Sequence, residues 1–327
     1  MCSAARPYAL SPLFPTWGME VQGIDLKQPV SQETIEAIRE DVTKHRLLIF
    51  RNQGVVSGER HVEISNWFGP CESTFYKHPR SPHPDVFRVS NDRLEGCTGV
   101  GRTGWHIDGS FQTAPFSYAL YHIVSCPTKG DTVFAPLHEV VGSLPAEQRA
   151  RWDRLWMLSD RRARDAKPLL YQHPLTGQDA LCFHLGMTEA FVWDLGTPKQ
   201  QVTTPPEAVE LLREIEEVFT KTAAHLIYHH KWQPGDFLIS DNLALGHEAD
   251  PDTQLPPSES EGDPDTQLPP SEVGLRVMHR TTVQGQYAPR KQEDPRFQRH
   301  ALQGDDEQQQ QGQQQQAAAA GGGQPCC

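Results

Sequence analysis

Trp105-His106-Ile107-Asp108-Gly109-Ser110-Phe111 is the stretch on which the interpretation of this chain depends. It follows a glycine-rich turn (99–104) and precedes an apolar, aromatic run (116–124), a context that predicts a strand entering a sheet. Residues two apart on a strand project from the same face, so we expect His106 and Asp108 to point the same way. Together they supply one imidazole and one carboxylate, two of the three protein ligands of a 2-His-1-carboxylate iron site.

The same spacing occurs a second time in the chain, at His83-Pro84-Asp85. Proline cannot donate to a strand ladder, and Pro82 and Pro84 together predict a loop at this point. Most His-x-Asp tripeptides are ordinary polar surface or a hydrogen-bonded pair. A metal site therefore needs a third ligand from elsewhere in the sequence.

His247 is the best candidate for that third ligand, because it follows a predicted strand (236–240) that ends in Asp241-Asn242. Four other histidines compete with it: His225, His229, His230 and His279. For each of these, a core or surface histidine without a metal is the commoner interpretation. His279 in addition stands between two arginines, so a metal there would lie beside two cations.

Composition narrows the class of protein. The chain has 327 residues, a net charge of −12 and no basic stripe, which argues against nucleic acid as a partner. No apolar run approaches ~18 residues, and the N-terminal residues do not resemble a secretory signal, so no membrane association is expected. Seven scattered cysteines, Cys71, Cys97, Cys126 and Cys182 among them, are expected to be reduced, as in the cytoplasm. A homo-oligomer is left open.

Pattern changes along the sequence divide it into a main domain with flanking and inserted segments. A ten-residue Pro-rich segment that starts at Asp250 is repeated with identical sequence from Asp263, which indicates a tandem duplication in a loop. The C-terminal residues are Gln, Ala and Gly repeats that cannot bury enough apolar surface to fold. The expected parts are an N-terminal extension (1–16), a folded domain (17–290) containing the duplicated insert (250–272), and a disordered tail (291–327).

Hydrophobic periodicity and capping signals predict helices and short strands within the domain. The expected helices cover 31–44, 57–68, 144–157 and a segment opened by the capping box Thr204-Pro-Pro-Glu207. The expected strands lie within 17–30, 47–50, 129–134, 168–186 (a pair), 236–240 and 274–283.

Two arginines near the end of the domain share one face of the last predicted strand. Arg276 and Arg280 are four residues apart there. A guanidinium is the side chain that best matches a buried carboxylate, although two surface ion pairs are the alternative.

Several motifs in sequence order resemble the Fe(II)- and 2-oxoglutarate-dependent dioxygenases of the taurine dioxygenase / 2,4-dichlorophenoxyacetate dioxygenase (TauD/TfdA) group. The resemblance runs from about Trp17 to Pro289 and rests on Trp17-Gly-Met-Glu-Val-Gln-Gly-Ile-Asp-Leu26, Leu47-Leu-Ile-Phe-Arg-Asn-Gln53, Trp105-His-Ile-Asp108, Gly130-Asp-Thr132, Trp232-Gln-Pro-Gly-Asp236 through to His247, and Arg276-Val-Met-His-Arg280. It implies a mainly β protein with flanking helices, a distorted double-stranded β-helix (a cupin-like jelly roll).

The resemblance also implies roles for individual residues. It makes His106, Asp108 and His247 the ligands of Fe(II), and gives the distal carboxylate of 2-oxoglutarate to Thr132 and Arg276. Arg280 falls where the family has a second arginine, which faces 2-oxoglutarate or an anionic substrate.

Two positions near the expected substrate site depart from the taurine enzymes. Ser81 replaces a tyrosine that follows the substrate-contacting histidine, which corresponds to His78 here, and Arg102 replaces an asparagine. These differences argue against taurine itself. His78, Arg102 and Arg280 together suggest a small anionic substrate.

The implied reaction consumes O₂ and 2-oxoglutarate, releases succinate and CO₂, and hydroxylates a small organic molecule. A carboxylate at Asp108, where related halogenases have a small residue, favours hydroxylation over halogenation. The same site could serve desaturation or cleavage of a C–S, C–O or C–N bond. A non-catalytic metal-binding jelly roll is the alternative from another class, and the 2-oxoglutarate anchor at Arg276 disfavours it.

Overall fold

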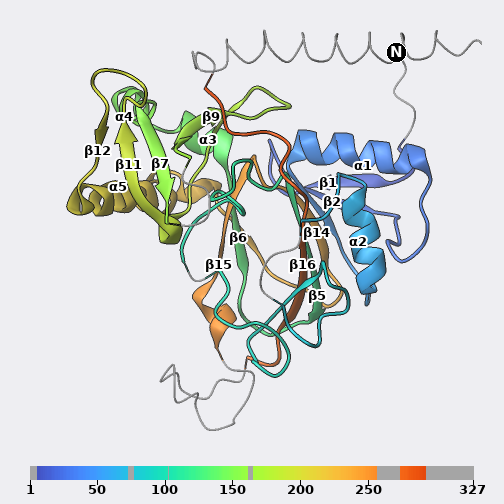
Figure 1. Ribbon diagram of the computed structural model, residues 1–327. Coiled ribbons are helices and arrows are strands. Elements are labelled where there is room, and N and C mark those ends of the chain that lie inside the picture. Colours follow the sequence, from blue (N-terminus) through green and yellow to red (C-terminus); the bar gives the residue numbers. More distant parts are fainter. Residues whose placement is uncertain (1–5, 73–76, 102, 161–164, 256–272, 292–327) are drawn as a thin grey trace, which may run out of the picture. The chain divides into compact units, whose positions relative to one another are not determined.

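The computed structural model describes residues 6–72, 77–101, 103–160, 165–255 and 273–291. A compact unit runs to Pro289. Its two principal sheets face each other without closing into a barrel, which is the expected distorted jelly roll (Figure 1). No helix among the described residues is long and apolar enough to cross a bilayer.

The larger sheet has seven strands. In spatial order its strands are β1 (Ala9–Pro12), β2 (Met19–Gln22), β3 (Leu47–Phe50), β14 (Phe237–Asp241), β5 (Tyr118–Ser125), β16 (Val277–Thr282) and β4 (Phe87–Ser90). All neighbours are antiparallel except β2 and β3. β1 pairs with β2 over its whole length, so regular structure begins inside the segment expected to be an N-terminal extension.

The smaller sheet lies opposite and consists of β13 (Tyr228–His230), β6 (Thr132–Pro136) and β15 (Leu245–Ala249). Apolar side chains from both sheets meet between them, among them Phe134 and Leu245 from the smaller sheet and Tyr121, Leu238 and Met278 from the larger. Tyr121 and Met278 belong both to this core and to the lining of the cavity described below.

Two helices cover the outer face of the larger sheet (Figure 1): α1 (Gln32–His45) and α2 (Gly58–Asn66). The hydroxyls of Ser31 and Ser57 cap them by accepting from the backbone N–H three residues on, as predicted. Their apolar stripes pack against alternate residues of β3 and β14.

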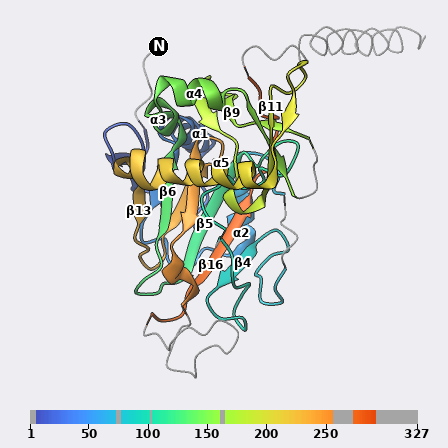
Figure 2. The same cartoon turned by 90° about the vertical axis from the view of Figure 1, so that its left-hand side faces the viewer.

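A third group of elements is inserted between β6 and β13 and lies on the opposite side of the molecule from α1 and α2 (Figures 1 and 2). Its members are α3 (Leu137–Gly142), α4 (Ala146–Trp152), β7 (Leu155–Ser159), β8 (Lys167–Pro168), β9 (Leu170–Gln172), β10 (Asp179–Leu181), η1 (Leu185–Met187), β11 (Thr188–Trp193), β12 (Gln201–Val202), α5 (Pro205–Glu217), a π turn η2 (Val218–Thr222) and η3 (Ala224–Leu226). One short turn, η4 (Pro251–Gln254), follows β15.

Two local predictions were wrong, and one strand was missed. The helix expected over 144–157 ends at Trp152, because Leu155–Ser159 pairs with β11 and is buried on both faces. The strand expected over 105–111 is a single bridge at His106 followed by turns. His247 follows β14 (Phe237–Asp241), as expected, but it lies inside a further strand, β15, that was not predicted.

Candidate metal and cosubstrate site

His106 extends the smaller sheet by one residue. Its N–H donates to the carbonyl of His247 (3.1 Å), and its carbonyl accepts from the N–H of His247 (2.9 Å). On the other side, Trp105 and Ile107 are hydrogen-bonded to the segment 183–185. The single bridge therefore fixes His106 directly beside His247, although their positions in the chain are far apart.

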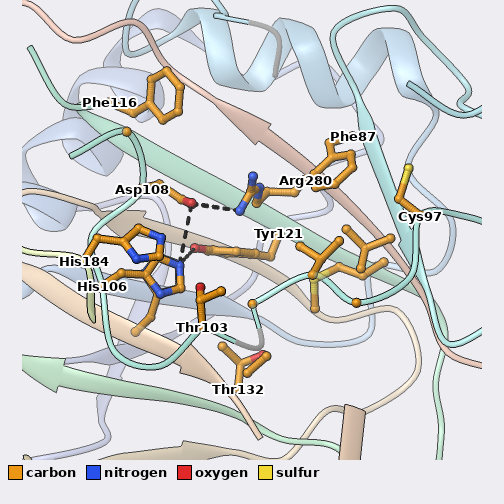
Figure 3. Close-up of a pocket in the computed structure, with 18 of the residues that line it drawn as sticks. Phe87, Cys97, Thr103, His106, Asp108, Phe116, Tyr121, Thr132, His184 and Arg280 are labelled. Carbon is orange, nitrogen blue, oxygen red and sulfur yellow. Dashed lines mark hydrogen bonds and ion pairs between the residues drawn. The ribbon is translucent and has the colours of Figure 1, made fainter. Parts of the chain in front are cut away.

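Three side chains converge next to this bridge: His106, Asp108 and His247 (Figure 3). All three are buried, and one potential ligand atom from each lies within 4.8 Å of the others. His106 Nε2 is 3.9 Å from Asp108 Oδ1, and His247 Nε2 is 3.5 Å from Asp108 Oδ2. His106 Nδ1 lies 2.7 Å from the carbonyl of Gly104, which fixes the tautomer that leaves Nε2 with a lone pair facing the cluster.

Asp108 reaches the cluster through a turn that a distant side chain holds in place. The Oδ1 of Asn242 accepts from the N–H of Asp108 (2.8 Å), and its Nδ2 donates to the carbonyls of Asp108 (2.9 Å) and Phe116 (2.7 Å). Gly109 has a φ of +74°, and a Cβ there would lie 2.8 Å from the Phe116 ring. Asn242 and Gly109 together place the carboxylate without a strand.

The electrostatics of the cluster favour an anionic Asp108 and a neutral His106. Burial raises the pKa of Asp108, but the Arg280 guanidinium and His247 lower it by more, so that pKa lies well below its usual range. Arg280 Nη1 donates to both oxygens of Asp108 at 3.0 Å. Burial, with His247 and His184 nearby, lowers the pKa of His106 well below its ordinary value. These are the protonation states in which such groups bind a divalent metal.

The cluster forms one wall of a cavity of about 290 Å³ between the two sheets. Phe87, Phe116 and Tyr121 supply much of its apolar lining (Figure 3). Thr132 and Arg276 also line it. The same cavity is therefore lined both by the His-Asp-His cluster and by the polar side chains of Thr132 and Arg276.

Arg276 is a buried cation without a counter-charge. It is 4% exposed, and burial lowers its pKa to about 10. In the part of the chain that the structure describes it makes no ion pair; Nε has no hydrogen-bond partner, and Nη2 donates only to Met278 Sδ at 3.7 Å. A buried charge is costly unless it is paired, so this end of the cavity is suited to an anion.

The structure brings most of the predicted site residues to this cavity: His106, Asp108, Thr132, His247, Arg276 and Arg280 all line it. Arg280 lies against Asp108 rather than with Thr132 and Arg276. His78 does not line the cavity; its ring contacts the carbonyl of Arg93 and the N–H of Arg80. Arg102 lies outside the described residues.

The competing histidines lie elsewhere. His230 pairs with Asp236, and His279 Nε2 accepts from Arg88 at 2.8 Å. His225 and His229 do not line the cavity. The His83–Asp85 pair is partly exposed, with His83 Nδ1 3.7 Å from Asp85 Oδ2.

Sequence reasoning missed three residues around the cluster. Asn242 was predicted only to end a strand, although an Asn directly after a buried strand can turn its amide back onto the backbone. Tyr121 places its hydroxyl 3.4 Å from His247 Nε2, and the His184 ring stacks on His106 with centroids 4.5 Å apart. Neither residue carries a local signal, because both contacts join segments far apart in the sequence.

The sequence is similar to known enzymes, both to a family model and to individual proteins. The family model described as "Taurine catabolism dioxygenase TauD, TfdA family" matches residues 9–261. The alpha-ketoglutarate-dependent 2,4-dichlorophenoxyacetate dioxygenase of Cupriavidus pinatubonensis is 24% identical over 262 residues, 72% of this chain and 90% of that protein. The alpha-ketoglutarate-dependent sulfate ester dioxygenase of Pseudomonas putida is 28% identical over 158 residues, 47% of this chain and 51% of that protein.

Solved structures show the same fold. The crystal structure of a taurine dioxygenase from Burkholderia xenovorans superposes with a TM-score of 0.66 at 25% identity, covering 88% of this chain and 94% of that one. Sequence, fold and the buried His-Asp-His cluster therefore agree, and the chain belongs to the TauD/TfdA family of dioxygenases that depend on alpha-ketoglutarate (2-oxoglutarate).

Proposed function

We propose that His106, Asp108 and His247 hold Fe(II). Two neutral imidazoles and one carboxylate match the donor set of non-haem iron oxygenases, and they occupy one side of the ion only. The other side faces the cavity, where a cosubstrate and O₂ can approach. The hydrogen bond from His106 to Gly104 and the clamp of Asn242 on Asp108 orient two of the three ligands.

Thr132 and Arg276 are proposed to bind the distal carboxylate of 2-oxoglutarate. The observation that carries the proposal is Arg276, which is buried, makes no ion pair among the described residues and lines the same cavity as the His-Asp-His cluster. A carboxylate would compensate its charge, and a 2-oxo acid group at the other end of the same molecule could chelate the metal. A protein that only stored a metal would have no use for this cation.

Iron, 2-oxoglutarate and O₂ together supply an oxidant for C–H bonds, with succinate and CO₂ as the other products. The chain's own residues have two tasks in this reaction. Phe87, Phe116 and Tyr121 exclude water and offer an apolar surface to the substrate. Asp108 supplies the carboxylate ligand, and a carboxylate at this position favours hydroxylation over halogenation.

The substrate is proposed to be a small, anionic organic molecule. Arg280 is the cationic group beside the metal cluster, and it lies over the Phe87 ring at 5.1 Å. A cavity of about 290 Å³, shared with the cosubstrate, has a volume that suits a small molecule. The named activities of the relatives, on a phenoxyacetate and on sulfate esters, are of this kind. Free thiols at Cys71, Cys97, Cys126 and Cys182 support a reducing compartment such as the cytoplasm.

The decisive experiment measures succinate. Purified protein, supplied with Fe(II), 2-oxoglutarate and O₂, is screened with phenoxyacetates, sulfate esters, sulfonates and amino-acid derivatives. We expect succinate to form only when both Fe(II) and 2-oxoglutarate are present, and at least one compound to accelerate it. In His247→Ala, iron binding and succinate should be lost together. Wild-type protein that binds iron fully yet forms no succinate, with or without a substrate, would overturn the proposal.

A further inference from the structure

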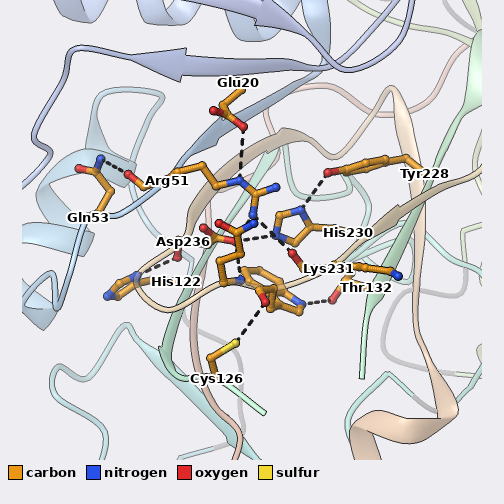
Figure 4. A network of polar contacts seen from close by, with 12 residues as sticks. Glu20, Arg51, Gln53, His122, Cys126, Thr132, Tyr228, His230, Lys231 and Asp236 are labelled. Atoms are coloured by element: carbon orange, nitrogen blue, oxygen red, sulfur yellow. Dashed lines mark hydrogen bonds and ion pairs between the residues drawn. The ribbon is translucent and has the colours of Figure 1, made fainter. Parts of the chain in front are cut away.

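The segment Trp232–Asp236 contacts Thr132 through the indole of Trp232. Trp232 is 8% exposed, and its indole Nε1 donates to Thr132 Oγ1 at 3.1 Å (Figure 4). Thr132 itself lines the cavity that holds Arg276. The indole is thus one residue removed from the proposed cosubstrate carboxylate.

The direction of this hydrogen bond determines what Thr132 can offer to a ligand. An indole N–H is a donor only, so the Thr132 hydroxyl must act as the acceptor toward Trp232. A hydroxyl has a single O–H donor, and that donor remains free for another partner. Arg276 also has donors only. The Thr132 O–H and the Arg276 guanidinium, which line the same cavity, can therefore both donate to a carboxylate bound there.

A buried ion-pair network holds the indole in this position (Figure 4). Asp236 is fully buried; its Oδ2 accepts from the N–H of Gln233 (2.9 Å), pairs with His230 Nε2 (3.2 Å) and pairs with Arg51. The His230 ring meets the Trp232 ring edge-on, with centroids 4.5 Å apart. His230 also lies opposite Thr132 in the β13–β6 register.

We propose that Trp232 is a positioning residue for 2-oxoglutarate. It keeps the Thr132 hydroxyl turned so that its O–H points to the distal carboxylate, and Asp236 fixes the turn that carries Trp232. The inference rests on the proposed function, because it concerns the same cosubstrate. It adds that selectivity for a dicarboxylate depends on a residue that touches no ligand.

The test compares two 2-oxo acids of equal length. 2-Oxopentanoate keeps the chelating end of 2-oxoglutarate and replaces the distal carboxylate by a methyl group. In Trp232→Phe, measured by calorimetry with Fe(II) under anaerobic conditions, we expect the Kd of 2-oxoglutarate to rise roughly 3- to 10-fold, the effect of one lost hydrogen bond. The Kd of 2-oxopentanoate should not change. In turnover, the KM for 2-oxoglutarate should rise more than kcat falls.

Two further variants separate positioning from a general loss of structure. Trp152 is also buried and donates its indole N–H, to Glu214 on α5, so Trp152→Phe is the matched control and should leave both affinities unchanged. In a Thr132→Val background, Trp232→Phe should add no further loss of 2-oxoglutarate affinity, because its effect passes through the hydroxyl.

A second measurement needs no variant and covers the case in which Trp232→Phe does not fold. With Zn²⁺ as a diamagnetic replacement, the ¹⁵N-indole resonance of Trp232 should shift on addition of 2-oxoglutarate and not of 2-oxopentanoate. Equal effects of Trp232→Phe on both acids, additivity with Thr132→Val, or an unmoved indole resonance would each refute the inference. Failure of the wild-type protein to prefer 2-oxoglutarate over 2-oxopentanoate would instead refute the proposed function.

Discussion

Two segments of this chain have a histidine and an aspartate separated by one residue, and only one of them belongs to the cavity. At His83–Asp85 the side chains are 28% and 37% exposed, and the N–H of Asp85 donates to His83 Nδ1 at 3.1 Å. At His106–Asp108 the side chains are 7% and 10% exposed. There the N–H of Asp108 donates instead to Asn242.

The difference lies in where the backbone and ring hydrogen bonds go. His83 Nδ1 accepts the N–H of Asp85, so a neutral ring carries its proton on Nε2 and keeps no free lone pair for a metal. His106 uses Nδ1 on a backbone carbonyl and keeps Nε2 for the cluster, while a side chain 134 positions away satisfies Asp108. Spacing supplies the donor atoms, but long-range contacts decide whether they are available to a metal.

The largest expected effect tests this contrast directly. Asp108→Asn replaces the anionic ligand by a neutral amide of the same shape, and should lower Fe(II) affinity by at least about 100-fold, with succinate formation lost. Asp85→Asn makes the same change at the exposed pair and should leave both unchanged. Iron titration of the two variants decides; equal losses would show that His83 and Asp85 also contribute to the site.

Removal of the clamp should have the next largest effect. Asn242→Ala leaves the N–H and carbonyl of Asp108 and the carbonyl of Phe116 without their partner, at a cost of roughly 2–4 kcal/mol in the free energy of unfolding. Fe(II) affinity should fall about 10- to 100-fold, as for other residues that orient metal ligands. Denaturant unfolding and iron titration measure the two effects.

Asn66→Ala serves as the control for the clamp, because Asn66 is exposed at the end of α2. It should change stability by less than ~0.5 kcal/mol. Asn242→Ala protein that is destabilised but binds iron normally would reduce Asn242 to a purely structural residue.

The smallest expected effect is on the pH dependence of stability, and it concerns His279, a buried histidine outside the cluster. Burial, with Arg88 and His122 nearby, lowers the pKa of His279 to about 3. In the unfolded chain the pKa of His279 is near 6.5. The stability that the neutral His279 contributes is therefore fully present above pH 6.5 and is lost progressively as the pH falls toward 3. Between pH 7 and 5 the contribution of His279 should decrease by about 2 kcal/mol.

His279→Gln should therefore show a shallower loss of stability on acidification than the wild type. Denaturant unfolding at a series of pH values measures both. Parallel slopes for wild type and His279→Gln would contradict the assignment of a neutral, buried His279.

Local signals were sufficient for part of the fold. Ser31 and Ser57 begin helices, and Thr204 with Glu207 forms a capping box, because these hydrogen bonds join residues three apart. The strand Leu47–Phe50 was predicted because an apolar run of that length leaves few alternatives. The family motifs then placed these elements in the order of a jelly roll.

Other features depend on contacts that no local pattern encodes. Leu155–Ser159 has an apolar spacing compatible with a helix, yet pairing with β11 makes it a strand. No local pattern indicated that Arg280 would pair with Asp108 or that Asn242 would hold the Asp108 turn. His106 and Asp108 were expected to meet through a strand, and they meet through a bridge and a glycine turn.

The pairing of β16 determines how far the connection that precedes this strand can vary in length. β16 is held on both sides, by β5 and by β4, so the register of Arg276 and Arg280 does not depend on the chain that leads to it. His247, at the other end of that connection, is held equally firmly by β6. Twenty-nine positions separate His247 from Arg276, and 16 would remain without the 13-residue repeat. The longer connection adds only about 0.5 kcal/mol of closure entropy, so natural variation in its length can proceed without altering the catalytic centre.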